Sequence, residues 1–145
     1  MPARLIDTAE IISRRILAID DEEPNVLLLR SLLEREGYTD IHCLTNPTSA
    51  LAAYIDLEPD LVLLDLMMPE VDGFQLLEAF GRHDQAEEFR PVLVLTADTT
   101  LQARRRALAL GAKDFVAKPF DVIEVALRIS NLLETRILYE RLRDS

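Results

Sequence analysis

The chain has 145 residues, of which 49% are hydrophobic and 29% are charged, and its formal net charge is −10. This length predicts a single domain with a sizeable apolar core. The acidic balance argues against direct binding to nucleic acid, which needs a basic surface, and no apolar segment is long enough to predict a membrane-spanning helix.

The N-terminal segment and the cysteine content both point to a cytoplasmic location. Asp7 and Glu10 interrupt the apolar residues near the N-terminus, so this segment does not resemble a signal peptide. Cys43 is the only cysteine, which excludes an internal disulfide. Its apolar surroundings predict a buried and unreactive thiol, which fits a reducing compartment.

Apolar runs typical of buried strands alternate with helical patterns along the chain. The five expected strands lie at 16–19, 39–44, 61–64, 92–95 and 115–117. The five expected helices lie at 24–35, 46–57, 73–80, 100–110 and 122–142. Five repeats of a strand followed by a helix predict an α/β fold, with a doubly wound parallel sheet and helices on both faces.

Polar residues end four of the expected strands. Asp20 and Asp21 follow the first strand, Asp65 the third, Thr96 the fourth and Lys118 the fifth. Because parallel strands bring their carboxyl ends to one edge of the sheet, three carboxylates and one ammonium should converge there. Three close carboxylates repel one another. Their oxygen atoms favour a hard divalent cation such as Mg²⁺ or Mn²⁺.

Together these groups describe a carboxylate that accepts a phosphoryl group. Phosphoryl transfer mainly needs positioning and charge neutralisation, and Lys118 and Thr96 can both bind phosphoryl oxygens. Taken singly, each residue has a simpler interpretation, because Asp and Thr at strand ends often cap the following turn. A phosphatase of the haloacid dehalogenase type also uses an Asp nucleophile. That family has an Asp-x-Asp pair after its first strand, whereas Asp20 and Asp21 are adjacent in this chain.

Four segments around these strand ends form a specific combination. They lie at 16–22, 63–74, 94–97 and 111–120, and they contain the polar strand ends described above. In this combination the chain resembles the receiver domain of response regulators in two-component signalling, over about residues 14–133. The resemblance implies a flavodoxin-like sheet with the strand order 2-1-3-4-5. It also implies a signalling domain whose only chemistry is self-catalysed phosphotransfer and autodephosphorylation.

The resemblance assigns a role to each polar strand end. It implies that Asp65 is the phosphoacceptor, and that its donor is a sensor histidine kinase or a phosphotransfer protein. It implies that Mg²⁺ is held by Asp20, Asp21, Asp65 and the backbone carbonyl of Met67. Lys118 and Thr96 would bind phosphoryl oxygens, and the peptide bond between Lys118 and Pro119 is expected to be cis.

The same resemblance identifies positions that would report or tune phosphorylation. Thr96 and Phe115 occupy the switch positions, and a phenylalanine there leaves only ring packing to change. Met67 and Asp98 occupy the two positions that tune the lifetime of the phosphoryl group. Met cannot hydrogen-bond an attacking water whereas Asp can, so we expect an intermediate lifetime.

A candidate output surface lies on the expected fourth helix. Leu101 and Leu108 fall on the side opposite the presumed core, flanked by Arg104 and Arg105. These residues form either a solvated basic face or a contact patch. The resemblance implies that the fourth helix, the fifth strand and the fifth helix form a surface for homodimerisation or output.

The last helix is longer than its apolar stripe. The stripe ends at Leu133 and turns polar at Arg136 and Glu140, while apolar residues shift to Ile137, Leu138 and Leu142. Leu138 and Leu142 are further candidates for the output surface. We therefore expect residues 14–133 to form the receiver domain, residues 1–13 to form an N-terminal extension, and residues 134–145 to leave the domain as a helical linker. The linker could dimerise or lead to an output domain. The alternative is a stand-alone receiver that acts by binding partners.

Overall fold

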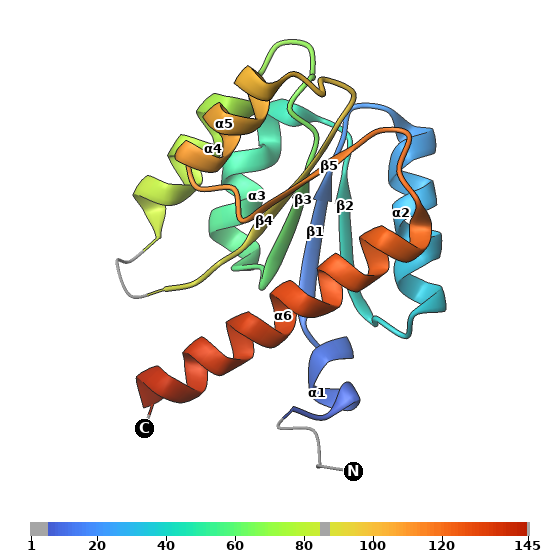
Figure 1. Cartoon of the computed structure of the whole chain (residues 1–145), viewed down its shortest axis with the longest axis vertical. Helices are drawn as coiled ribbons and strands as arrows, with labels where there is room; N and C mark the ends of the chain where they lie inside the picture. The colour runs from blue at the N-terminus through green and yellow to red at the C-terminus, as the bar shows by residue number, and fades with distance from the viewer. Residues whose placement is uncertain (1–5, 85–87, 145) are drawn as a thin grey trace.

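The computed structural model describes residues 6–84 and 88–144, and its centre is a five-stranded parallel sheet (Figure 1). The strand order is β2-β1-β3-β4-β5, which confirms the predicted fold class and topology. The strands are β1 (Arg15–Ile19), β2 (Asp40–Leu44), β3 (Leu61–Leu64), β4 (Val92–Thr96) and β5 (Asp114–Ala117).

Helices cover both faces of the sheet (Figure 1). They are α1 (Thr8–Ile12), α2 (Glu23–Arg35), the short 3-10 helix η1 (Pro47–Ser49), α3 (Ala50–Leu57), α4 (Gly73–His83), α5 (Leu101–Ala109) and α6 (Val122–Asp144). The helices α2 and α6 pack on one face, and α3, α4 and α5 pack on the other. Among the described residues, no helix has both the length and the apolar character needed to span a membrane.

The apolar runs of the sequence arise because the central strands are buried on both faces. In β3, Leu61 and Leu63 face the layer formed with α2 and α6, whereas Val62 and Leu64 face the layer formed with α3, α4 and α5. All four side chains are almost completely buried. A strand in this position has no polar face, so its sequence reads as a continuous apolar run that ends where the strand reaches solvent.

Two expectations about single segments are corrected by the structure. Cys43 is half-buried on the edge strand β2 rather than buried, although its burial still raises the pKa of the thiol. The last helix does not leave the domain after Leu133, because Ile137 is only 1% exposed and belongs to the same apolar cluster as α2 and β1. The extension before β1 also contributes, since Ile6 and Ile11 are buried in that cluster.

A close approach of backbone to backbone fixes the loop between β3 and α4. A Cβ atom at Gly73 would lie 2.5 Å from the Cα atom of Leu66, so only glycine fits at the start of α4. Asp72 caps this helix by accepting a hydrogen bond from the backbone N–H of Phe74 at 2.9 Å. The loop that follows β3 is therefore tied to α4 immediately after Asp65.

Substituting Gly73 with alanine tests this approach. We expect Gly73→Ala to lower the free energy of unfolding by about 1–3 kcal/mol, because the added methyl group must displace backbone. The matched control in the same helix is Gly81→Ala, where an added Cβ meets no atom within 4 Å. That change should raise stability by about 0.5–1 kcal/mol. Urea unfolding of both variants measures the difference, and equal stabilities would contradict the proposed constraint.

Candidate functional site

Backbone hydrogen bonds between the strands fix the polar strand ends at one edge of the sheet. The N–H of Asp20 donates to the carbonyl of Leu44, and the N–H of Asp65 donates to the carbonyl of Ile19, both at 3.1 Å. Across the other side of the sheet, the N–H of Lys118 donates to the carbonyl of Thr96 at 2.8 Å. Asp20, Asp65 and Lys118 each directly follow a strand, and Thr96 is the last residue of one. Pairing between neighbouring strands therefore fixes the position of all four residues.

Three carboxylates meet at this edge, as the sequence predicts. Asp20, Asp21 and Asp65 each offer a carboxylate oxygen, and these oxygens lie within 4.8 Å of one another. Asp20 is 2% exposed and Asp65 is 7% exposed, while Asp21 is half-buried. An all-oxygen donor set of this size fits a hard divalent cation better than a softer metal that prefers nitrogen or sulfur.

One ammonium group faces two of these carboxylates. Nζ of Lys118 lies 2.7 Å from Oδ2 of Asp20 and 3.3 Å from Oδ2 of Asp65. Burial opposes the charged form of the amine, but the hydrogen bond to Asp20 and the charges of both carboxylates outweigh it and raise the pKa of Lys118. One positive charge against three negative charges leaves an excess that a divalent cation would balance.

Burial is also the main influence on Asp65. It raises the pKa of the Asp65 carboxyl, and the negative charge of Asp20 acts in the same direction. The N–H of Met67, which donates to Oδ1 of Asp65 at 3.0 Å, and the ammonium of Lys118 oppose this increase. A cation beside Asp65 would favour the ionised form that a nucleophile requires.

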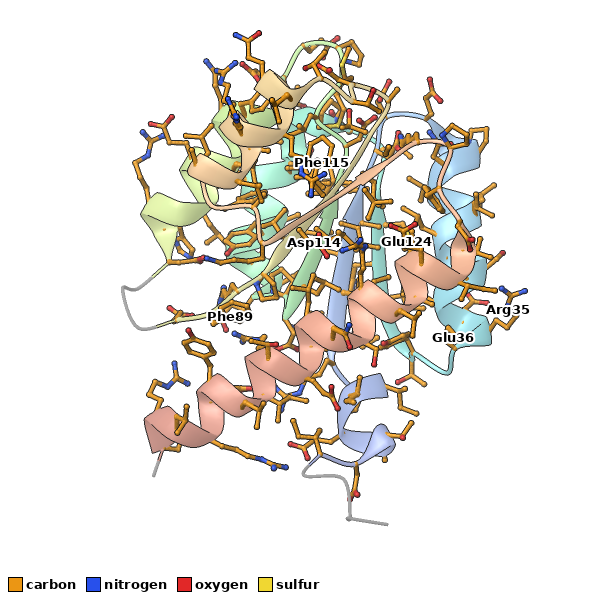
Figure 2. The ribbon with its side chains drawn as sticks, in the orientation of Figure 1. Arg35, Glu36, Phe89, Asp114, Phe115 and Glu124 are labelled. Carbon is orange, nitrogen blue, oxygen red and sulfur yellow. The ribbon has the colours of Figure 1, made fainter. Side chains whose placement is uncertain are left out.

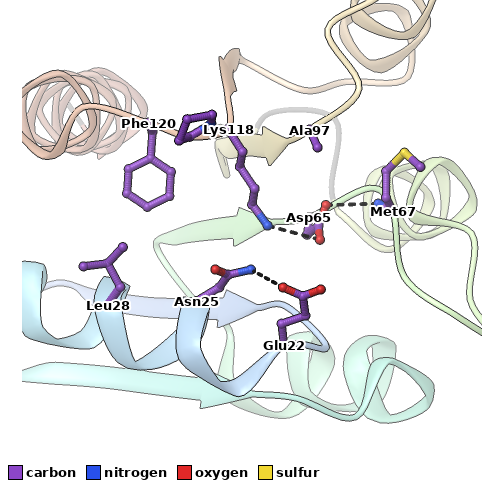
Figure 3. Close-up of a pocket in the computed structure, with 9 residues that line it drawn as sticks. Glu22, Asn25, Leu28, Asp65, Met67, Ala97, Lys118 and Phe120 are labelled. Carbon is purple, nitrogen blue, oxygen red and sulfur yellow. Dashed lines mark hydrogen bonds and ion pairs between the residues drawn. The ribbon is translucent and has the colours of Figure 1, made fainter.

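Asp65 opens into a cavity with one apolar wall (Figure 3). The cavity has a volume of about 460 Å³, and it is lined on one side by Asp65, Met67 and Lys118. Leu28 on α2 and Phe120 after β5 line the opposite side. The sequence interpretation missed this wall. The available signal was an apolar residue, Leu28, on the helix face that the core does not use, and it remains 48% exposed.

The peptide bond between Lys118 and Pro119 is cis, which confirms the expectation from the sequence. Met67 lines the cavity, and its backbone forms an isolated bridge with Asp72. Asp98 does not line the cavity. Its Oδ1 instead accepts a hydrogen bond from the N–H of Thr100 at 3.0 Å.

Thr96 and Phe115 occupy neighbouring strands behind the acidic cluster. Thr96 is completely buried at the end of β4, and its hydroxyl accepts a hydrogen bond from the N–H of Asp98 at 3.3 Å. Phe115 is buried on β5, and the guanidinium of Arg104 lies 6.0 Å from the centre of its ring. Figure 2 shows Phe115 beside α5, toward the centre of the molecule. A side chain of α5 is therefore in contact with the predicted switch residue.

The residues predicted for an output surface fall into two groups. Leu101, Arg104, Arg105 and Leu108 are exposed on α5, which is the expected fourth helix under its structural label. Leu138 and Leu142 are exposed near the C-terminal end of α6, which lies on the face of the sheet opposite α5 (Figure 1). The structure therefore does not bring these two groups together into one patch.

A doubly wound parallel domain with an acidic cluster, a lysine and a threonine at the carboxyl edge has the architecture of a signalling receiver domain. The sequence model of the response regulator receiver domain matches residues 16–130. The chain belongs to this family, and the resemblance seen in the sequence is confirmed.

The chain is similar to several characterised members of this family. It is 35% identical to the regulatory protein AtoC of Escherichia coli over 89% of this chain and 27% of that protein. It is 39% identical to the regulatory protein VanRc of Enterococcus gallinarum over 83% of this chain and 50% of that protein. It thus spans between about a quarter and a half of the length of these relatives.

Among solved structures, the fold resembles that of a chain in the crystal structure of the CheX–CheY–BeF3–Mg²⁺ complex from Borrelia burgdorferi. The TM-score is 0.75 and the identity is 27%, over 82% of this chain and 88% of that chain. The sheet and its helices therefore match a known receiver-type arrangement in three dimensions as well as in sequence.

The acidic cluster predicts divalent-cation binding that depends on charge at this edge. We expect Asp21→Asn to weaken Mn²⁺ binding by at least roughly tenfold, because it removes one of three converging carboxylates. Electron paramagnetic resonance of free Mn²⁺ measures the affinity, and competition by Mg²⁺ extends the result to that ion. The control is Asp56→Asn, which removes an exposed charge on α3. Equal losses in both variants would show a general effect of net charge and contradict a specific site.

Proposed function

We propose that Asp65 accepts a phosphoryl group from the phosphohistidine of a sensor histidine kinase or a phosphotransfer protein. The observation that carries this proposal is the placement of Asp65 in an open cavity, beside two further carboxylates and within 3.3 Å of the Lys118 ammonium. The carboxylate attacks phosphorus to form an O–P bond. The N–P bond of the phosphohistidine breaks, and its electron pair returns to the imidazole of the donor.

The residues around Asp65 divide the work of this transfer. Asp20, Asp21, Asp65 and the backbone carbonyl of Met67 would hold Mg²⁺, which when bound neutralises charge on the phosphoryl oxygens. Lys118 bridges Asp20 and Asp65 and can turn to bind a phosphoryl oxygen when the group arrives. The hydroxyl of Thr96 would donate to another phosphoryl oxygen.

The shape of the cavity supports a protein donor. A phosphohistidine side chain must enter the cavity beside the apolar wall formed by Leu28 and Phe120, against which a partner can bury apolar surface. The similar Borrelia burgdorferi structure contains BeF3 and Mg²⁺ together with CheX and CheY. Its likeness supports a phosphoryl site of the same kind here. A cytoplasmic location is part of this proposal.

We further propose that phosphorylation changes a surface formed by α5, β5 and α6. This surface would mediate homodimerisation or control an output domain, in keeping with relatives of which this chain spans only a part. A homodimer through the end of α6 is a second arrangement that the exposed Leu138 and Leu142 allow. The alternative function remains a stand-alone receiver that acts by binding partners.

Phosphorylation by a small donor provides the central test. With Mg²⁺ and acetyl phosphate, intact mass spectrometry should find one added phosphoryl group on the unaltered chain and none on Asp65→Asn. Lys118→Ala should slow the reaction by about 10²-fold, because a preorganised charge is lost. Asp56→Asn serves as the matched control and should react normally. Persistent modification of Asp65→Asn would refute the assignment, and turnover of a phosphoester would favour a phosphatase instead.

The lifetime of the phosphoryl group provides a separate prediction for Met67 and Asp98. Met67→Asn should accelerate loss of phosphate, because the amide can hydrogen-bond an attacking water next to Asp65. Asp98→Ala should slow it if the Asp98 carboxylate leaves its hydrogen bond with the N–H of Thr100 and reaches that water in the phosphorylated protein. Each change should be about several-fold, in line with the loss or gain of one hydrogen bond. The rate of autodephosphorylation of each labelled variant measures these effects. Unchanged rates in both variants would contradict a role of these two positions in the phosphoryl lifetime.

A further inference from the structure

A cluster of charged residues joins the end of α6 to the edge of the sheet where the strands begin. Asp60, which directly precedes β3, is its centre. Oδ1 of Asp60 accepts a hydrogen bond from Nε of Arg136 at 2.6 Å, and Oδ2 accepts one from the N–H of Arg15 at 2.8 Å. The side chains of Asp60 and Arg136 are only 15% and 11% exposed, so this pair is largely shielded from solvent.

The segment before β1 supplies a second layer of charges. Arg14 lies 3.5 Å from Oδ1 of Asp60 and also pairs with Glu140 on α6. Glu10 on α1 pairs with Arg141 at 2.7 Å. Positive and negative side chains thus alternate between α1, the start of β3 and the last three turns of α6. Figure 1 shows α1 and this part of α6 side by side beneath the sheet.

Apolar contacts hold the two halves of α6 unequally. The first half buries Val125, Ile129 and Leu133, whereas Ile137 is the only fully buried apolar side chain among residues 134–144. The second half adds one aromatic contact, in which Tyr139 stacks on Phe89 with 4.8 Å between ring centres. Figure 2 shows Phe89 beside this part of the helix. Charged pairs therefore carry a larger share of the docking in the second half.

Residues 134–144 should therefore differ little in free energy between a state docked on the domain and a released state. An isolated helix of fewer than about 12 residues is marginal in water, so residues 134–144 depend on the surface beneath them. The outer pairs, Arg14 with Glu140 and Glu10 with Arg141, are partly exposed. Such pairs contribute only about 0–1 kcal/mol each, and salt weakens them. A modest perturbation of the cluster should therefore release the helix end without unfolding the sheet.

We propose that α1 and Asp60 form a latch that holds residues 134–144 of α6 against the receiver domain. The closed latch fixes the direction in which α6 ends and covers the apolar side chains of Ile11 and Ile137. Opening it frees the helix end and exposes apolar surface to a partner. The latch lies at the edge of the sheet opposite Asp65. The proposal of a latch does not depend on whether Asp65 accepts a phosphoryl group.

Hydrogen–deuterium exchange of the full chain tests the latch. Arg14→Glu should increase exchange about tenfold in peptides from residues 134–144, because it places like charges beside Asp60 and Glu140. Peptides from residues 122–133 should remain protected. The double change Arg14→Glu with Glu140→Arg should restore much of the protection by re-forming the pair in reverse. Arg143→Gln is the matched control, since Arg143 faces its neighbour Asp144 and not α1.

The unaltered chain provides a second measurement that does not depend on a variant folding. Raising salt from roughly 0.05 M to 1 M shortens the screening length to about 3 Å and should selectively increase exchange in residues 134–144. The proposal is overturned if neither Arg14→Glu nor salt changes exchange there. It is also overturned if residues 122–133 and the strands lose protection to the same extent, because the cluster would then support the whole fold and not a separate latch.

Discussion

The electrostatic strain among three clustered carboxylates is the constraint on which the site depends. Asp20, Asp21 and Asp65 would move apart in a flexible loop, but here the ladder hydrogen bonds of Asp20 and Asp65 hold them at adjacent strand ends. Lys118 compensates only part of the charge. The rigid sheet therefore maintains an arrangement that costs stability alone and would gain stability if a divalent cation were bound.

The strand β3 connects two charged sites with different tasks. Asp65 at its carboxyl end lies among like charges, in a cavity open to a partner. Asp60 precedes its other end and is matched by arginines from α6 and from the segment before β1. Four apolar residues, buried on both faces, separate the two. The same element thus carries an unbalanced carboxylate suited to chemistry and a balanced one suited to holding structure.

The sequence was informative where local patterns determine the structure. Buried parallel strands read as apolar runs, and polar residues that end them must meet at one edge, so the grouping of Asp20, Asp21, Asp65 and Lys118 could be predicted. The docking of α6 could not be predicted in this way. Arg136 looked like the start of a solvated segment, because its partner Asp60 lies 76 positions away and no periodic pattern reports such a pair.

Side-chain direction was similarly hidden for Asp98, and its observed position suggests how a signal would leave the site. The N–H of Asp98 donates to the hydroxyl of Thr96, and the N–H of Thr100 donates to the carboxylate of Asp98. Thr100 in turn caps α5 by accepting from the N–H of Ala103 at 3.1 Å. Three hydrogen bonds therefore run in series from the buried end of β4 to the first turn of α5.

This series gives the proposed switch a physical route. If the Thr96 side chain rotates to place its hydroxyl against a phosphoryl oxygen, the hydroxyl oxygen moves away from the N–H of Asp98 and that hydrogen bond is weakened. The loop from Asp98 to Thr100 then loses its anchor on β4 and carries the cap of α5 with it. Arg104, one turn further along α5, lies over the ring of Phe115. A shift of α5 would therefore alter the packing of Phe115. Conversely, a change in the position of the Phe115 ring would alter its contact with Arg104 on α5.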